Sequence, residues 1–196
     1  MPAVTSPEQL FVHELQDMYY AEKALTRTLP QLAQEASDGE LSRAFTSHHK
    51  QTEKHVTNLE KVFRQIGKPA ETHPCPGIEG IKKEHDEFMR ENQPSAGMRD
   101  AFLTGAAARA EHYEIAAYTG LVSKARALGE REAVELLQQN LKDEKDALKK
   151  VETISKRILK ESNGGTSRRK TTRSSSRART TTRAKRSTRT SASRSR

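Results

Sequence analysis

Cysteine is nearly missing from this 196-residue sequence, and tryptophan is missing altogether. The single cysteine, Cys75, has no partner for an intramolecular disulfide, which favours a reducing compartment. No apolar run approaches the roughly 18 residues that a membrane-spanning helix needs. The first residues, MPAVTSPEQLF, lack the basic and apolar regions of a secretory signal peptide. We therefore expect a cytoplasmic protein without membrane contact.

Acidic residues are missing from the C-terminal stretch 163–196, which carries 12 Lys and Arg and no Asp or Glu. The remaining 1–162 holds 23 basic and 26 acidic residues, a formal charge of −3 against +9 for the whole chain. This asymmetry predicts a mildly acidic folded domain over 1–162 and a basic tail that contacts DNA or another polyanion. Because the tail has almost nothing to bury, we expect 163–196 to be disordered.

Strand patterns are also lacking, and the apolar residues of 1–162 recur at helical spacing. Ser6 and Pro7, with Gln9 three residues after Ser6, have the form of a helix start with a capping box. Turns are predicted at 37–39 and at Gly129, and 67–97 holds four of the seven prolines. Helices are expected over 7–36 (with Pro30 as a candidate kink), 40–66, 97–128 and 130–161, and a short helix is expected over 78–90.

Two long helical hairpins joined by a long crossover are typical of a ferritin-like bundle. The predicted fold class is therefore all-α, a four-helix bundle with a short helix in its crossover and a disordered basic tail. The crossover carries Ile78, Ile81 and Phe88, apolar side chains beyond those that a four-helix core accommodates. We expect them to cover a partner subunit, so a homodimer or larger homo-oligomer is predicted.

Glu114 stands at the centre of an apolar stripe on the helix expected over 97–128. At about 100° per residue, the positions within roughly 40° of it are apolar or aromatic. They are Leu103, Ala107, Ala110, Tyr118, Leu121 and Ala125. An unpaired buried carboxylate costs several kcal/mol, so Glu114 must be paired, protonated or metal-bound. Glu111 precedes it by one helical turn, some 60° from the stripe centre.

The other helices place matching polar groups on their inward faces. Glu144 sits at the centre of the stripe of the last helix, and reflection through the Gly129 turn puts it level with Glu114. Glu22 lies within about 40° of the stripe of the first helix. On the second helix His48 faces inward, whereas the histidines at 49 and 55 lie at the edges of the stripe and Glu53 points outward.

These residues predict a metal site in one layer of the bundle. Carboxylates with imidazole suit iron or manganese, and a dinuclear centre needs about this many carboxylates. Two alternatives stay open. The glutamates can be solvated, as helical glutamates usually are, and His48 is equally consistent with a hydrogen-bonded core histidine that binds no metal. The predicted ligands are Glu22, His48, Glu111, Glu114 and Glu144.

Several segments resemble the YciE/YciF ferroxidase family of ferritin-like proteins, collinearly over about residues 6–160. They are MYYAEKALTRTLPQLAQ, LSRAFTSHHKQTEKHVTNLEKVF, CPGIEGI, AEHYEIAAYTGL and LKDEKDALKKV. The resemblance implies a helical bundle, usually dimeric, that serves in stress responses and carries a dinuclear metal centre. Glu111 and Glu114 also resemble the Glu-x-x-Glu of the third rubrerythrin helix. The Glu-x-x-His of rubrerythrins is not matched, because Val56 and Ala147 stand at the histidine positions; a weaker, mononuclear or vestigial site is therefore an alternative.

Two functions are consistent with these observations. In the first, Fe(II) is oxidised by dioxygen or peroxide at a di-metal centre that Glu111 or Glu114 bridges. In the second, the bundle is a non-enzymatic, nucleoid-associated or structural stress protein. The tail is expected to bind nucleic acid by charge, and the alternative for the tail is a role in solubility. The predicted nucleic-acid contacts are Arg168, Arg169, Lys170, Arg173, Arg177, Arg179, Arg183, Lys185, Arg186, Arg189, Arg194 and Arg196.

Overall fold

The computed structural model describes the backbone of residues 4–174 and the side chains of residues 4–163. Its regular elements over these residues are all helical, as the sequence predicts. In chain order they are α1 (Pro7–Glu35), α2 (Gly39–Gln65), α3 (Pro76–Asn92), α4 (Ala96–Leu128) and α5 (Arg131–Ser174). Of the helices in the described part of the chain, none combines the length and apolarity that crossing a membrane requires.

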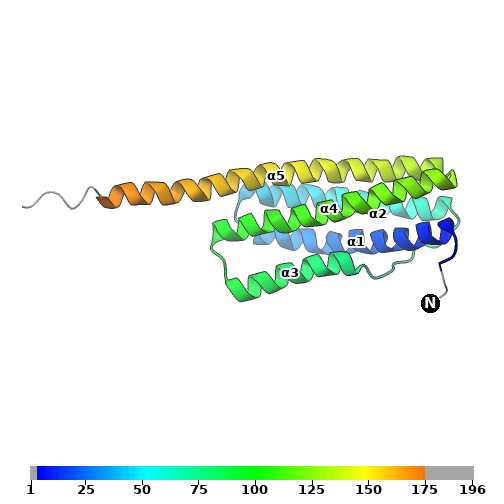
Figure 1. Cartoon of the computed structure of the whole chain (residues 1–196), viewed down its shortest axis with the longest axis horizontal. Helices are drawn as coiled ribbons and strands as arrows, with labels where there is room; N and C mark the ends of the chain where they lie inside the picture. Colours follow the sequence, from blue (N-terminus) through cyan, green and yellow to red (C-terminus); the bar gives the residue numbers. More distant parts are fainter. Residues whose placement is uncertain (1–3, 175–196) are drawn as a thin grey trace, which may run out of the picture. The chain divides into compact units, whose positions relative to one another are not determined.

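The unit Met1–Ser162 is a four-helix bundle with one helix added on its outside. Helix α1 packs against α2 and α4, and the 131–162 part of α5 completes the bundle (Figure 1). Helix α3 packs against α4. Two helical hairpins, α1–α2 and α4–α5, are thus joined by a crossover that contains a short helix. The predicted all-α ferritin-like arrangement is confirmed.

The helix ends follow from short sequence signals. Ser6 Oγ accepts a hydrogen bond from Gln9 N, and Gln9 Oε1 accepts one from Ser6 N, each at 3.2 Å, which completes the predicted capping box of α1. Asp38 caps α2 by accepting from Leu41 N at 2.9 Å. Gly129 ends α4 with φ at 78°, a left-handed conformation that favours glycine. Helix α1 continues through Pro30 to Glu35, so this proline does not end it.

The crossover differs from the prediction in how it uses its apolar side chains. Ile78 is fully buried and Ile81 packs against the same core. Phe88 stacks on Phe102 of α4, with ring centroids 3.7 Å apart. Ile78 therefore belongs to the core of the chain itself, and Ile81 and Phe88 pack partly against it. The expectation that these residues cover a partner subunit stays a prediction.

Helix α5 also differs from the prediction, since it does not end near residue 161 but continues to Ser174. It passes through Gly164 and Gly165, and each glycine lowers helix stability by only about 1 kcal/mol, whereas a helix-breaking proline is missing from this stretch. A second unit, Asn163–Arg196, begins where the tail was predicted to begin. The prediction of disorder over 175–196 lies outside the described residues, and so do the side chains of all 12 predicted nucleic-acid contacts.

Candidate metal centre

Four helices of the bundle contribute buried polar side chains to one layer of its core. Helix α4 contributes two glutamates three residues apart and α2 two histidines seven residues apart, so each pair lies on one helical face. Each residue is fully or almost fully buried. The six residues are Glu22 of α1, His48 and His55 of α2, Glu111 and Glu114 of α4, and Glu144 of α5.

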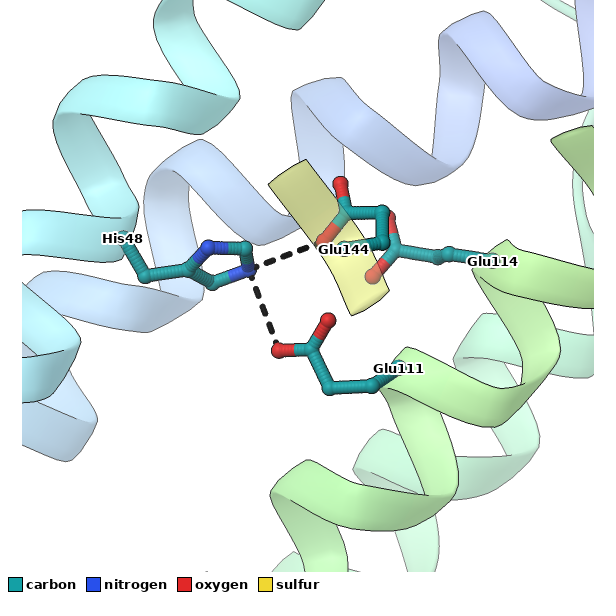
Figure 2. Close-up of side chains that lie close together, drawn as sticks. All are labelled: His48, Glu111, Glu114 and Glu144. Carbon is teal, nitrogen blue, oxygen red and sulfur yellow. Dashed lines mark ion pairs between the residues drawn. The ribbon is translucent and has the colours of Figure 1, made fainter. Parts of the chain in front are cut away.

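The first part of this cluster surrounds His48 (Figure 2). His48 Nε2 lies 3.2 Å from Glu111 Oε1 and 3.6 Å from Glu144 Oε2. With Glu114, each of these residues offers one ligand atom, and the four atoms lie within 4.8 Å of one another. This spacing leaves one central position that all four side chains can reach.

The second part of the cluster surrounds His55. His55 Nδ1 lies 2.7 Å from Glu144 Oε1 and 3.3 Å from Glu22 Oε1. Glu22, His55 and Glu144 likewise offer ligand atoms within 4.8 Å of one another. Glu144 belongs to both groups, so its two oxygens face two neighbouring positions.

A chain of buried hydrogen bonds fixes Glu22. Tyr118 OH donates to Glu22 Oε1, and Asn140 Nδ2 donates to Tyr118 OH at 2.9 Å. Asn58 Nδ2 donates in turn to Asn140 Oδ1 at 2.8 Å. The network runs from α2 through α5 and α4 to α1, and it leaves Glu22 Oε2 without a hydrogen-bond partner.

The cluster concentrates the unsatisfied polar atoms of the bundle. Within residues 4–163, the buried side-chain nitrogens and oxygens that lack a hydrogen-bond partner belong, Arg99 Nε apart, to the six cluster residues. Both oxygens of Glu144 and of Glu114 lack such a partner, but Glu144 lies within ion-pair distance of His48 and His55. Glu114 is the most extreme case, because among the described residues its oxygens have neither a hydrogen-bond partner nor an ion pair. Buried polar groups almost always have a hydrogen-bond partner or a counter-charge, so these atoms require added protons, water or a cation as partners.

Burial raises the pKa of three of the four glutamates. It holds the pKa of Glu111 and of Glu114 well above the usual range, and the nearby charge of Glu144 adds to the rise. Burial also raises the pKa of Glu22, against the opposing effect of His55. Burial acts in the same direction on Glu144, but His55 and His48 outweigh it and lower its pKa. The site thus combines three carboxyls of raised pKa with one, Glu144, whose pKa is lowered.

The two histidines shift in opposite directions. Burial lowers the pKa of His48 and outweighs the attraction of Glu144, so the ring is neutral and free to bind a metal. Burial would also lower the pKa of His55, but Glu22 and Glu144 outweigh it and raise the pKa to about 10. In the metal-free site, protons on His55 and on the glutamates therefore neutralise the negative charge of the cluster. A bound cation would neutralise this charge in their place.

All five residues predicted from the sequence, Glu22, His48, Glu111, Glu114 and Glu144, are brought together in the core. His55 is the residue that sequence reasoning missed, since it was placed at the edge of the α2 stripe and is instead fully buried. The signal was its spacing: seven residues are two helical turns, so His55 lies only roughly 20° from His48 on the helix. Glu53 is exposed, as expected.

Comparison with known proteins identifies the family of the chain. Residues 6–163 match the family described as a domain of unknown function (DUF892). Protein YciF of Escherichia coli (strain K12) is 37% identical over 139 residues, which cover 70% of this chain and 83% of YciF.

Solved structures give the same family. The crystal structure of the E. coli stress protein YciF superposes with a TM-score of 0.76 at 34% identity, covering 80% of this chain and 99% of YciF. YcfI of Rhodopseudomonas palustris, described as a candidate structural protein, gives 0.74 at 37% identity, with 76% and 95% covered. A protein of Xanthomonas campestris gives 0.63 at 20% identity, with 79% and 94% covered, and shares the fold. The chain therefore belongs to the DUF892 family, the YciE/YciF-type helical bundles that its sequence resembles.

Proposed function

We propose that the buried cluster binds two metal ions, iron or manganese. The observation that carries this proposal is Glu114, a fully buried carboxylate with no hydrogen-bond partner for either oxygen. Four carboxylates and two imidazoles are also the donor set of ferritin-like di-metal proteins. Oxygen and imidazole donors of this kind suit iron and manganese. His55 supplies the second imidazole that the sequence pattern lacked.

Each residue has a role in this proposal. Glu144 would be shared by the two ions, because it belongs to both groups; from the sequence we expected Glu111 or Glu114 to bridge. His48, Glu111 and Glu114 would hold one ion, and Glu22 and His55 the other. Tyr118 and Asn140 would keep Glu22 in position through their hydrogen bonds.

With iron bound, the protein would oxidise Fe(II) as its substrate, and the electrons would pass to dioxygen or peroxide. Several carboxylates in a buried site favour the more highly charged Fe(III), since Coulomb attraction grows with charge and with exclusion of water. Removing Fe(II) fits a role in stress protection, because the E. coli relative is described as a stress protein.

The basic tail supports a second element of the proposal, that 163–196 binds nucleic acid and brings the bundle to it. Its 12 positive charges are segregated from a body with a formal charge of −3. The alternative to oxidation is a non-enzymatic, nucleoid-associated or structural protein with a vestigial site. The description of the R. palustris relative favours that alternative. A homodimer or larger assembly is also proposed, on the family resemblance.

Anaerobic Fe(II) titration of metal-free protein, followed by metal analysis, tests the metal site. We expect two tightly bound ions per chain. Glu144→Gln should lose both, because both groups share this residue. Glu53→Gln is the matched control, since Glu53 is exposed on α2 and should leave the stoichiometry unchanged. Equal stoichiometry in the Glu144 variant would contradict the proposal.

Activity separates the two functions. Dioxygen or peroxide added to the Fe(II)-loaded protein should give Fe(III) faster than in the Glu144→Gln variant. If the protein binds nucleic acid but takes up no metal and consumes no oxidant with Fe(II), the non-enzymatic function is correct.

A further inference from the structure

An apolar cavity of about 110 Å³ lies directly beside the cluster, between α1, α3 and α4. Most of its wall is apolar, with Thr28, Gln31 and Lys82 among the polar residues that also line it. The cavity reaches His48, Glu111 and Glu114 of the cluster. The apolar wall residues include Leu25, Leu29, Leu32, Ile78, Ile81 and Ala106.

The cavity also has a charged rim. Glu35 of α1 and Asp86 of α3 line it, and their side chains are 38% and 72% exposed, whereas Glu111 and Glu114 are buried. His85 Nε2 lies 2.9 Å from Glu35 Oε2 and so links α3 to α1 at this rim. Helix α3 thus forms an outer wall between the acidic cluster and solvent, a role that a bare four-helix bundle leaves unfilled.

The lining selects against charged molecules. At the rim, the carboxylates of Glu35 and Asp86 oppose anions, and Lys82 and His85 offset part of this effect. A largely apolar wall cannot replace the water that a hydrated ion of either sign loses. Water itself needs two to four polar partners, and the aliphatic side chains that form most of the wall offer none. An engineered apolar cavity of about 150 Å³ in another protein takes up xenon or benzene, so a cavity of this size suits a neutral molecule no larger than these.

We propose that this cavity binds a small uncharged, apolar molecule of the kind that dioxygen represents, and leads it to His48, Glu111 and Glu114. Binding itself requires no metal, whereas the use of the molecule at the cluster rests on the proposed function. Dioxygen, rather than charged or strongly hydrated oxidants, is then the co-substrate that reaches the site by this route.

Xenon is the probe, applied to the metal-free full-length protein and followed by methyl NMR. Saturable shifts are expected for methyl groups of Leu25, Leu29, Ile78 and Ile81. Ala106→Leu should weaken xenon binding about tenfold or more, because it fills the cavity from α4. Ala116→Leu makes the same change at an exposed position of α4 and should leave binding unchanged. Azide, a small anion, should cause no saturable shift of these methyl groups.

Three results would overturn the proposal: no saturable xenon binding, equal binding by the Ala106 variant, or azide binding as strong as that of xenon. If Ala106→Leu does not fold, Ile81→Phe fills the same cavity from α3 and decides between the same outcomes. Because the metal-free protein is used, a failure here leaves the Fe(II) titration unaffected, and a failed titration leaves xenon binding unaffected.

Discussion

At the scale of single residues, Glu114 dominates the physics of the core. It is fully buried, neither of its oxygens has a hydrogen-bond partner, and its neighbours Glu111 and Glu144 are also acidic. Burial raises its pKa well above the usual range, so the metal-free protein keeps a proton there. A bound metal would release that proton, which couples metal binding to pH and to folding stability.

The metal-free protein should therefore lose stability as pH rises from about 7 to 8.5. The pKa of His55 is raised to about 10, so over this range the folded chain keeps a proton that the unfolded chain releases. The raised pKa values of Glu22, Glu111 and Glu114 act in the same direction, starting above about pH 4.5. Each proton kept only by the folded state lowers the free energy of unfolding by about 1.4 kcal/mol per pH unit. Urea unfolding in the presence of a chelator measures this slope.

The control for the pH experiment is His55→Gln, which removes the group whose pKa is raised to about 10. Its slope should be shallower than that of the natural protein over the same pH range. His48 does not interfere, because its pKa is lowered and its effect falls below about pH 6.5. A stability that rises with pH in the metal-free protein would show that the cluster is already neutralised in another way.

The two histidines should each account for one metal ion. Because His48 and His55 belong to different groups, His48→Ala and His55→Ala should each bind one ion instead of two. His49→Ala is the matched control on the same helix, since this histidine is absent from both groups. Metal analysis after gel filtration gives the stoichiometry. Unchanged metal content in the His55 variant would remove this residue from the site.

The residue scale also shows what the sequence can and cannot predict. Glu114 and Glu144 were predictable because apolar neighbours surround them on the helical wheel. The apolar pattern alone missed His55, because the apolar stripe of α2 marks only part of its buried face; its seven-residue spacing from His48 was the available signal. Asn58 is buried on that face too, where it donates to Asn140 of α5. Where buried residues are polar and pair with a neighbouring helix, the sequence shows no apolar pattern. The full extent of the buried face of α2 therefore becomes evident only when the helix that it packs against is known.

At the scale of elements, α3 is held to the bundle at its first turn by a cluster around Tyr113 of α4. Tyr113 OH donates to Asp17 Oδ2 at 2.8 Å and lies 2.9 Å from Cys75 Sγ. The ring covers Gly77, where a β-carbon would meet Tyr113 Cε2 at 2.5 Å. The spacing of its apolar residues predicts α3 from the sequence. The need for glycine at position 77 cannot be predicted in this way, because it arises from contact with Tyr113, 36 positions away in the chain.

Gly77→Ala should destabilise the protein by about 1–3 kcal/mol, the usual range for overpacking, because either the Tyr113 ring or α3 must shift. Gly80→Ala, one turn later in α3, meets no atom within 4 Å. It should be neutral or stabilising by up to about 1 kcal/mol, since alanine favours a helix over glycine. Urea unfolding of both variants gives the two signs, and equal effects would show that Tyr113 does not constrain α3.

At the scale of the whole chain, charge is divided between its two units. The 1–162 part has a formal charge of −3, and 163–196 has 12 basic and no acidic residues. Family membership covers residues 6–163, so the basic stretch lies outside the shared domain. Composition predicted this division directly, because charge is a sum over residues and needs no fold. A mildly acidic bundle is thereby joined to a basic segment, which we propose as the part that attracts polyanions.

The full chain should bind DNA or RNA without sequence preference, and a 1–162 truncation should not. The tail holds no aromatic residue to stack on bases, so its affinity would come from phosphate neutralisation and counterion release. If roughly six to ten charges engage phosphates, binding should weaken about 10³- to 10⁵-fold between about 50 and 200 mM salt. Mobility shifts of both proteins over this salt range provide the measurement, with metal content confirming that the truncation keeps its fold. Equal binding by the truncation, or an affinity that does not change with salt, would show that the tail is not the nucleic-acid-binding element.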